Sequence, residues 1–271
     1  VVKDAIALSW YYVQELTPDT VVPIVPVLVG GDDVTVYTDG RYAIPFAEAY
    51  IHHYERLTKD DDLLSVLAIV AGGKKTDAPE RDHFEIDDYI IQNPGPLTAS
   101  AGVAIVGRNF PFHIAYDLAE ELVSRGKKLG KKPGTVPCST INFHVLRDAT
   151  VLDPDETLDE YKGRVQRPFL VGHYAQKRIA AESDTSPTIE DWWRQVLRAV
   201  AVFDGKDPDS PGETVGDPFP RARANRIVKL LAEGKEEQAT TEWGDALQNA
   251  PSAGLFAKQL KLLPPHSSSS D

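Results

Sequence analysis

With 271 residues, of which 42% are hydrophobic, the chain can bury a sizeable core, and no apolar run approaches the roughly 18 residues of a membrane span. The net charge of −12 argues against direct nucleic-acid binding by this chain alone, although a metal ion can neutralise the phosphates of a bound nucleotide. A single cysteine, Cys138, excludes an intrachain disulfide and fits a reducing cytoplasm, so we expect a cytoplasmic protein without a membrane segment.

The first part of the chain predicts a hairpin between two helices. Apolar residues at helical spacing predict a helix over residues 3–17, and a second amphipathic helix follows a turn at residues 39–40. Between these helices, residues 25–29 and 34–38 are rich in β-branched side chains, which indicates two strands joined by a tight turn.

Further strands and helices follow the second helix. Residues 63–70 form a short apolar run, which is either a strand or a buried helix, and residues 71–96 predict a long polar loop or insertion. Beyond them we expect a buried strand over residues 97–106 and a helix over residues 112–128. Two more extended segments are predicted over residues 139–146 and 167–171.

The chain changes character near residue 186, where helical stretches become dominant. The predicted helices cover residues 187–202, 220–233, 236–249 and 253–263. We therefore expect an α+β domain over residues 1–180, a helical appendage over residues 181–263 and a disordered tail over residues 264–271.

The most informative motif is Gly30-Gly31-Asp32-Asp33, at the turn of the predicted hairpin. Glycines allow positive φ and let a bulky ligand approach the backbone, and the two carboxylates suit a hard cation such as Mg²⁺. The alternative is an ordinary hairpin turn, since glycine and aspartate are common turn residues. Neighbouring strand residues also point to opposite faces, so the two carboxylates share a metal only where the turn relaxes that alternation.

A hairpin with this motif, followed by an amphipathic helix, resembles the palm domain of nucleotide cyclases and polymerases. Three later segments narrow the resemblance: SAGVAIV over residues 100–106, the helix with AYDLAEEL that ends at Lys127-Lys128, and INFHVL over residues 141–146. Together with Arg-Pro-Phe at residues 167–169, they resemble the second palm domain of the large, cyclic-oligoadenylate-making subunit of type III CRISPR effectors and its stand-alone relatives. The likeness covers roughly residues 20–175.

The resemblance implies a ferredoxin-like palm that binds ATP, or alternatively GTP, through Mg²⁺ or Mn²⁺ held by Asp32 and Asp33. It also implies nucleotidyl transfer or cyclisation in a CRISPR-type defence system, with a second palm domain or CRISPR-type subunits as partners. The nucleotide-binding residues that it implies are Gly30, Gly31, Ser100 and Lys127.

Other interpretations of the same residues remain open. The positive charges of Lys127 and Lys128 interact favourably with the helix dipole in the last helical turn, without any ligand. Ser100 and Gly102 fit a role in close strand packing. Palm enzymes carry a further metal-binding aspartate on a strand before the helix that precedes the hairpin. The sequence from Val1 opens at that helix, so we expect only half of a two-metal site from these residues. The competing functions are a non-catalytic palm relative that binds nucleotide or a protein partner, and an unrelated α+β domain.

Overall fold

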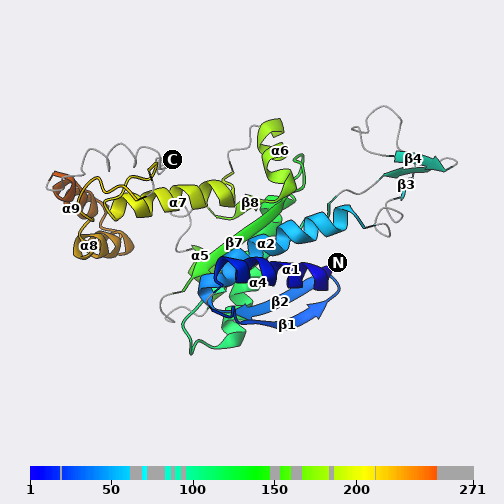
Figure 1. The fold of residues 1–271 in the computed structure, drawn as a ribbon, viewed down its shortest axis with the longest axis horizontal. Helices are drawn as coiled ribbons and strands as arrows, with labels where there is room; N and C mark the ends of the chain where they lie inside the picture. The colour runs from blue at the N-terminus through cyan, green and yellow to red at the C-terminus, as the bar shows by residue number, and fades with distance from the viewer. Residues whose placement is uncertain are drawn as a thin grey trace. The chain divides into compact units, whose positions relative to one another are not determined.

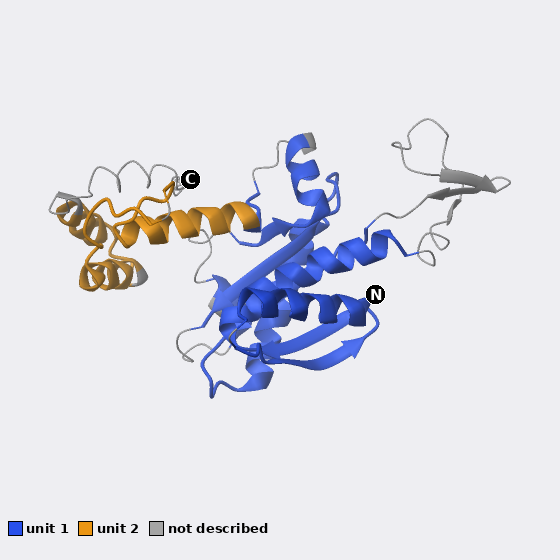
Figure 2. Ribbon diagram, viewed as in Figure 1, with its two compact units in different colours: residues 1–189 blue, residues 190–271 orange. Residues whose placement is uncertain are grey.

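The structure is a computed structural model that describes residues 1–18, 20–61, 69–71, 83–86, 89–92, 96–146, 153–159, 167–182, 186–210 and 212–248. The predicted helix over residues 253–263 and the predicted tail over residues 264–271 lie outside the described residues. The chain forms two compact units, residues 1–189 and 190–271 (Figure 2). The boundary predicted between residues 180 and 181 falls within a helix, α6 (His173–Glu182).

The predicted α+β class is confirmed, and the first unit begins with the predicted hairpin between two helices. Helix α1 (Val2–Leu16) leads into strands β1 (Ile24–Gly30) and β2 (Asp33–Thr38), and α2 (Gly40–Lys59) follows. Figure 1 shows the hairpin running alongside α1. The two strands pair antiparallel, with a register shift between Pro26 and Leu28.

A small apolar core holds the hairpin against α1 and α2. The buried side chains of this core, and the strand residues packed against them, are Val13, Val22, Tyr42, Phe46, Ile24 and Val36. Ile24 and Val36 pack against the buried residues, so they lie on the face of the hairpin that is turned toward the helices. The indole of Trp10 on α1 also donates a hydrogen bond to the Val22 carbonyl, at 3.1 Å.

A second sheet contains β6 (Ser100–Ile105), β7 (Ser139–Val145) and β8 (Phe169–Val171) in the order β6-β7-β8. Strands β6 and β7 are parallel, and α4 (Phe112–Gly130) connects them, whereas β8 runs antiparallel to β7. A Cβ at Gly102 of β6 would overlap the Ala119 carbonyl of α4, which shows that the helix packs closely on this sheet. The interpretation of Gly102 as a packing residue is therefore confirmed.

Several elements depart from the predictions. Strands β3 (Ile69–Ala71), β4 (His83–Ile86) and β5 (Tyr89–Gln92) form a small antiparallel sheet, so the loop predicted over residues 71–96 is wrong for β4 and β5. Helices α5 (Pro154–Asp159) and α6 were not predicted. Strands of three or four residues, and a six-residue helix, offer too few positions for a period to show.

The hairpin and the β6-β7-β8 sheet are separate sheets among the described residues. The structure therefore shows an α+β fold, and not one continuous palm sheet that contains both the hairpin and β6. No helix in the described ranges has the length and apolar character needed to cross a membrane.

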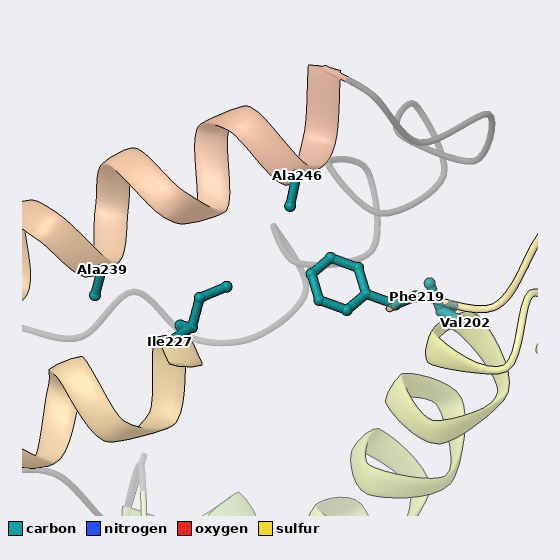
Figure 3. Close-up of a cluster of buried hydrophobic side chains, with 5 residues drawn as sticks. All are labelled: Val202, Phe219, Ile227, Ala239 and Ala246. Carbon is teal, nitrogen blue, oxygen red and sulfur yellow. The ribbon is translucent and has the colours of Figure 1, made fainter. Parts of the chain in front are cut away.

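The second unit, in its described part, contains the predicted helices α7 (Ile189–Phe203), α8 (Arg221–Ala232) and α9 (Glu236–Gln248). Its core joins these helices to the loop that precedes α8 (Figure 3). The buried members of this core are Val202, Phe219, Ile227, Ala239 and Ala246. The ring of Phe219 stacks on Trp243 with centroids 5.6 Å apart, so this unit has an apolar core of its own.

A buried carboxylate connects α2 to the second sheet. Glu55 is 3% exposed, and its Oε2 accepts a hydrogen bond from the His173 N–H at 2.6 Å, at the start of α6. Its Oε1 accepts a hydrogen bond from the Ser139 hydroxyl, which in turn accepts one from the Ala99 N–H at 3.0 Å. Gly172 has a φ of 86° and lies so close to this carboxylate that a Cβ would overlap it.

Glu55→Gln should destabilise the first unit by roughly 2 kcal/mol, because an amide NH₂ replaces one of two buried acceptor oxygens. Urea unfolding should show a lower midpoint, and hydrogen exchange should show weaker protection of the His173 amide. Glu15→Ala, on the exposed side of α1, is the control and should change neither. Unchanged stability in Glu55→Gln would contradict the anchoring role of Glu55.

His144 is buried and neutral. The Arg167 guanidinium donates to His144 Nδ1 at 2.7 Å, and burial, together with the charge of Arg167, lowers the pKa of His144 to about 4. The unfolded histidine takes up a proton near pH 6.5, while the folded one resists it. The full contribution to stability is thus present above pH 6.5 and is lost as the pH falls toward 4, by at most about 3 kcal/mol.

His144→Gln should flatten the fall in unfolding free energy between pH 6.5 and pH 4, as measured by urea titrations at several pH values. His113→Gln replaces an exposed histidine on α4 and should leave the fall unchanged. Equal slopes for wild type and His144→Gln would show that His144 does not carry this pH dependence.

Candidate functional site at the hairpin turn and helix α4

The Gly30-Gly31-Asp32-Asp33 motif forms the tip of the hairpin, as predicted. Gly30 ends β1 and pairs with Asp33, the first residue of β2, so Gly31 and Asp32 form the two-residue turn. Gly31 has a φ of 59°, which favours glycine there. A Cβ at Gly30 or Gly31 would meet no atom within 4 Å, so a ligand can reach the backbone of the turn.

The two carboxylates of the turn are exposed and lie near different helices. The Asp32 charge acts on Tyr54 of α2, where it adds to burial in raising the pKa of that phenol. The Asp33 charge acts on Tyr116 of α4. Within the described ranges, no basic side chain forms an ion pair with Asp32 or Asp33, so neither negative charge is locally compensated.

Tyr116 links the hairpin to α4. Its phenol lies close to Glu120, one turn further along the helix, and to Thr35 of β2, and both act on its pKa. The pKa of Tyr116 is raised, chiefly by the Glu120 charge, with a smaller contribution from Asp33. Two negative groups, one from the turn and one from α4, therefore act on the same phenol.

The same side of α4 continues into a surface cavity of about 420 Å³. The residues that line it are Glu120, Val123, Ser124, Lys127 and Lys128. Both lysines are exposed, and they lie in the last turns of the helix. A cavity that joins one carboxylate to two ammonium groups suits an anionic ligand with hydrogen-bond donors.

Ser100 lies at the start of β6, where β6, β7 and α4 meet. Its hydroxyl oxygen accepts a hydrogen bond from the Thr140 hydroxyl at 3.0 Å, and a Cβ at Gly126 of α4 would lie 3.8 Å from the Ser100 Cβ. The structure therefore places Ser100 under the helical residue that precedes Lys127. This position is compatible with the strand-packing interpretation, and a nucleotide contact by Ser100 stays a prediction.

Sequence reasoning gave no role to Tyr116 or Glu120, although both belong to the helix segment on which the resemblance rests. The missed signal is their spacing. Positions 116, 120, 124 and 127 are three or four residues apart, so they share one face of a helix that ends at Lys127. Only the structure shows that this face begins beside the hairpin turn.

The chain matches no protein-family model, and it matches no curated protein. The site must therefore be interpreted from its own chemistry. Asp32 and Asp33 offer exposed, uncompensated carboxylate oxygens beside an open glycine backbone. This donor set fits Mg²⁺, which proteins usually bind through one or two carboxylates together with the phosphates of a substrate.

Glu120→Gln should lower the pKa of Tyr116, because the amide removes the negative charge that most disfavours the tyrosinate. An NMR titration of ¹³Cζ-labelled tyrosines can follow Tyr116 once its signal is assigned by loss in Tyr116→Phe. Glu121→Gln, one residue along α4, is the matched control and should leave Tyr116 unchanged. If Glu120→Gln leaves the Tyr116 titration in place, Glu120 and Tyr116 do not interact as described.

Proposed function

We propose that this chain is a palm-type module that binds ATP, or alternatively GTP, through Mg²⁺ or Mn²⁺ at the hairpin turn and that belongs to a nucleotidyltransferase or cyclase. The observation that carries the proposal is the position of the acidic turn beside α4: Asp33 acts on Tyr116, and the face of the helix that continues from Tyr116 leads through Glu120 to the cavity lined by Lys127. Metal-binding carboxylates and a phosphate-binding cation are the two parts that phosphoryl transfer requires near the triphosphate.

Each residue of the site has a distinct role in this proposal. Asp32 and Asp33 would hold the cation, and the open backbone of Gly30 and Gly31 leaves room for the phosphates. Lys127 would balance phosphate charge from the far side. The bound metal ion supplies electrostatic stabilisation of the phosphoryl oxygens. Tyr116 lies where β2 and α4 meet, between the two parts of the site.

The finer assignment, a ferredoxin-like palm of the type III CRISPR kind, rests on the order hairpin, helix, strand, helix, strand and on the motifs within it. In this proposal the chain works in the cytoplasm, in a CRISPR-type defence system. Its partners would be a second palm domain or CRISPR-type protein subunits. The separate hairpin sheet is the point at which the structure departs from that assignment.

The alternative is a palm relative that binds nucleotide, or a partner protein, without catalysis. One observation favours it: the charges of Asp32 and Asp33 act on tyrosines of two different helices, and do not converge on one point. In that case the turn holds a nucleotide-bound cation through one carboxylate and serves as a sensor or scaffold.

The Asp32→Asn, Asp33→Asn double variant should lose the Mg²⁺-dependent part of ATP binding, because the amides give the cation weaker, uncharged ligands. Calorimetric titrations of ATP with Mg²⁺ and with EDTA measure that part directly. Asp217→Asn, an exposed aspartate of the second unit, is the control. An equal Mg²⁺ effect in wild type and double variant would exclude the hairpin as the metal site.

Incubation of the whole chain with labelled ATP and Mg²⁺ or Mn²⁺ separates the two functions. A product that disappears in the double variant supports the enzyme, whereas Mg²⁺-dependent binding without product supports the non-catalytic module. Absence of both contradicts both.

Lys127→Gln should weaken ATP binding in Mg²⁺ roughly fivefold, because a charged contact to phosphate is replaced by a neutral one. Lys3→Gln removes an exposed lysine from α1 and should have no effect. Binding of adenosine, which has no phosphate, should be equal in all of these variants. A normal ATP affinity in Lys127→Gln would remove Lys127 from the site.

A further inference from the structure

A row of three aromatic rings lies beside the acidic turn, and two of them, Tyr37 and Phe112, have no role in the function proposed so far. The row consists of Tyr37 on β2 with Phe112 and Tyr116 on α4. The centroids of Tyr37 and Phe112 are 6.4 Å apart, and those of Phe112 and Tyr116 are 6.3 Å apart. The rings therefore form one continuous surface across the junction of strand and helix.

The rings of this row leave much of their surface open. Tyr37 is 52% exposed and Phe112 is 48% exposed. The planes of Tyr37 and Phe112 make an angle of 56°, and those of Phe112 and Tyr116 make an angle of 34°, so no ring is covered face to face by its neighbour. Stacking of a flat apolar group on an exposed aromatic face is favourable, because it removes both surfaces from water.

The position of the row relative to the charged groups selects the ligand. Tyr37 lies four positions after Asp33 on β2, a distance of about 13 Å along the strand. Phe112 and Lys127 are fifteen positions apart on α4, or about 22 Å along the helix axis. Along the protein, the exposed aromatic surface comes first, the carboxylates second and the cations third. A nucleoside triphosphate has the matching order of base, metal-bound phosphate and terminal phosphate.

We propose that Phe112 and Tyr37 form a stacking platform for the nucleobase of the nucleotide, an inference that rests on the proposed function and extends it. A base has two π faces, and stacking on aromatic side chains tolerates any base. Purines should bind more tightly than pyrimidines, because their larger rings cover more of the platform. Tyr116, at one end of the row, lies close to Glu120 of α4 and to Thr35 of β2, where the helix and the strand meet.

Base stacking can be measured without the metal. Saturation-transfer NMR of ATP in EDTA should show the strongest transfer to the H2 and H8 protons of the adenine in wild type. Phe112→Ala should remove that transfer and weaken ATP and adenosine binding about tenfold, with or without Mg²⁺. Phe112→Trp should preserve both, because it keeps an aromatic face. Tyr12→Ala is the matched control, since Tyr12 on α1 is 49% exposed.

The outcomes separate this inference from the proposed function. If Phe112→Ala binds ATP normally while the Asp32→Asn, Asp33→Asn variant loses its Mg²⁺ dependence, the platform is wrong and the metal site stands. If adenosine binding depends on Phe112 but no variant alters a Mg²⁺ effect, the platform stands and the metal site is wrong. If wild type binds neither ATP nor adenosine, both are wrong. Circular dichroism of Phe112→Ala checks that the variant is folded, and Phe112→Leu gives a second apolar but non-aromatic test.

Discussion

The buried carboxylate of Glu55 is the interaction on which the arrangement of the first unit depends. The hairpin packs on α1 and on the first half of α2, whereas α4 packs on the β6-β7-β8 sheet. Glu55, near the end of α2, binds β7 through Ser139 and the start of α6 through the His173 N–H. The helix is thereby fixed to the second sheet at one end while it supports the hairpin at the other. Asp33 and Thr35 of the hairpin lie close to Tyr116 of α4. A shift of α2 would therefore move the acidic turn relative to Lys127 and Lys128.

The predictable part of this fold is the part with regular spacing. Helices α1, α2, α4, α7, α8 and α9, and the long strands, follow from apolar periodicity, and the hairpin turn follows from its glycines. The site was only half predictable. Asp32, Asp33 and Lys127 stand out by type and motif, but Tyr116 and Glu120 acquire a role only when β2 and α4 meet. Glu55 was likewise invisible, because a glutamate on an amphipathic helix normally faces solvent, and its partners lie 84 and 118 residues further along the chain.

The acidic side chains of this protein differ in whether a basic side chain neutralises them. The exposed carboxylates of the turn have no basic partner among the described residues, whereas some acidic side chains near α4 are paired: Arg125 alone binds Glu121, Asp155 and Asp159. The ion pairs of Arg125 fix α5 against α4, so they stabilise the helix that carries the cavity. Two neighbouring exposed carboxylates without a basic partner in the described part of the chain can attract a cation from solution.

The register shift in β1 has a consequence for the behaviour of the exposed hairpin. Val25, Val27 and Leu28 are exposed on an edge strand, and such strands tend to recruit other chains by backbone pairing. Pro26 provides no N–H, and the shift between Pro26 and Leu28 interrupts the ladder at the centre of the strand. A foreign strand can therefore form only a short, broken run of hydrogen bonds there. The hairpin can keep an apolar outer surface next to its acidic tip and still discourage the chain from assembling into extended sheets.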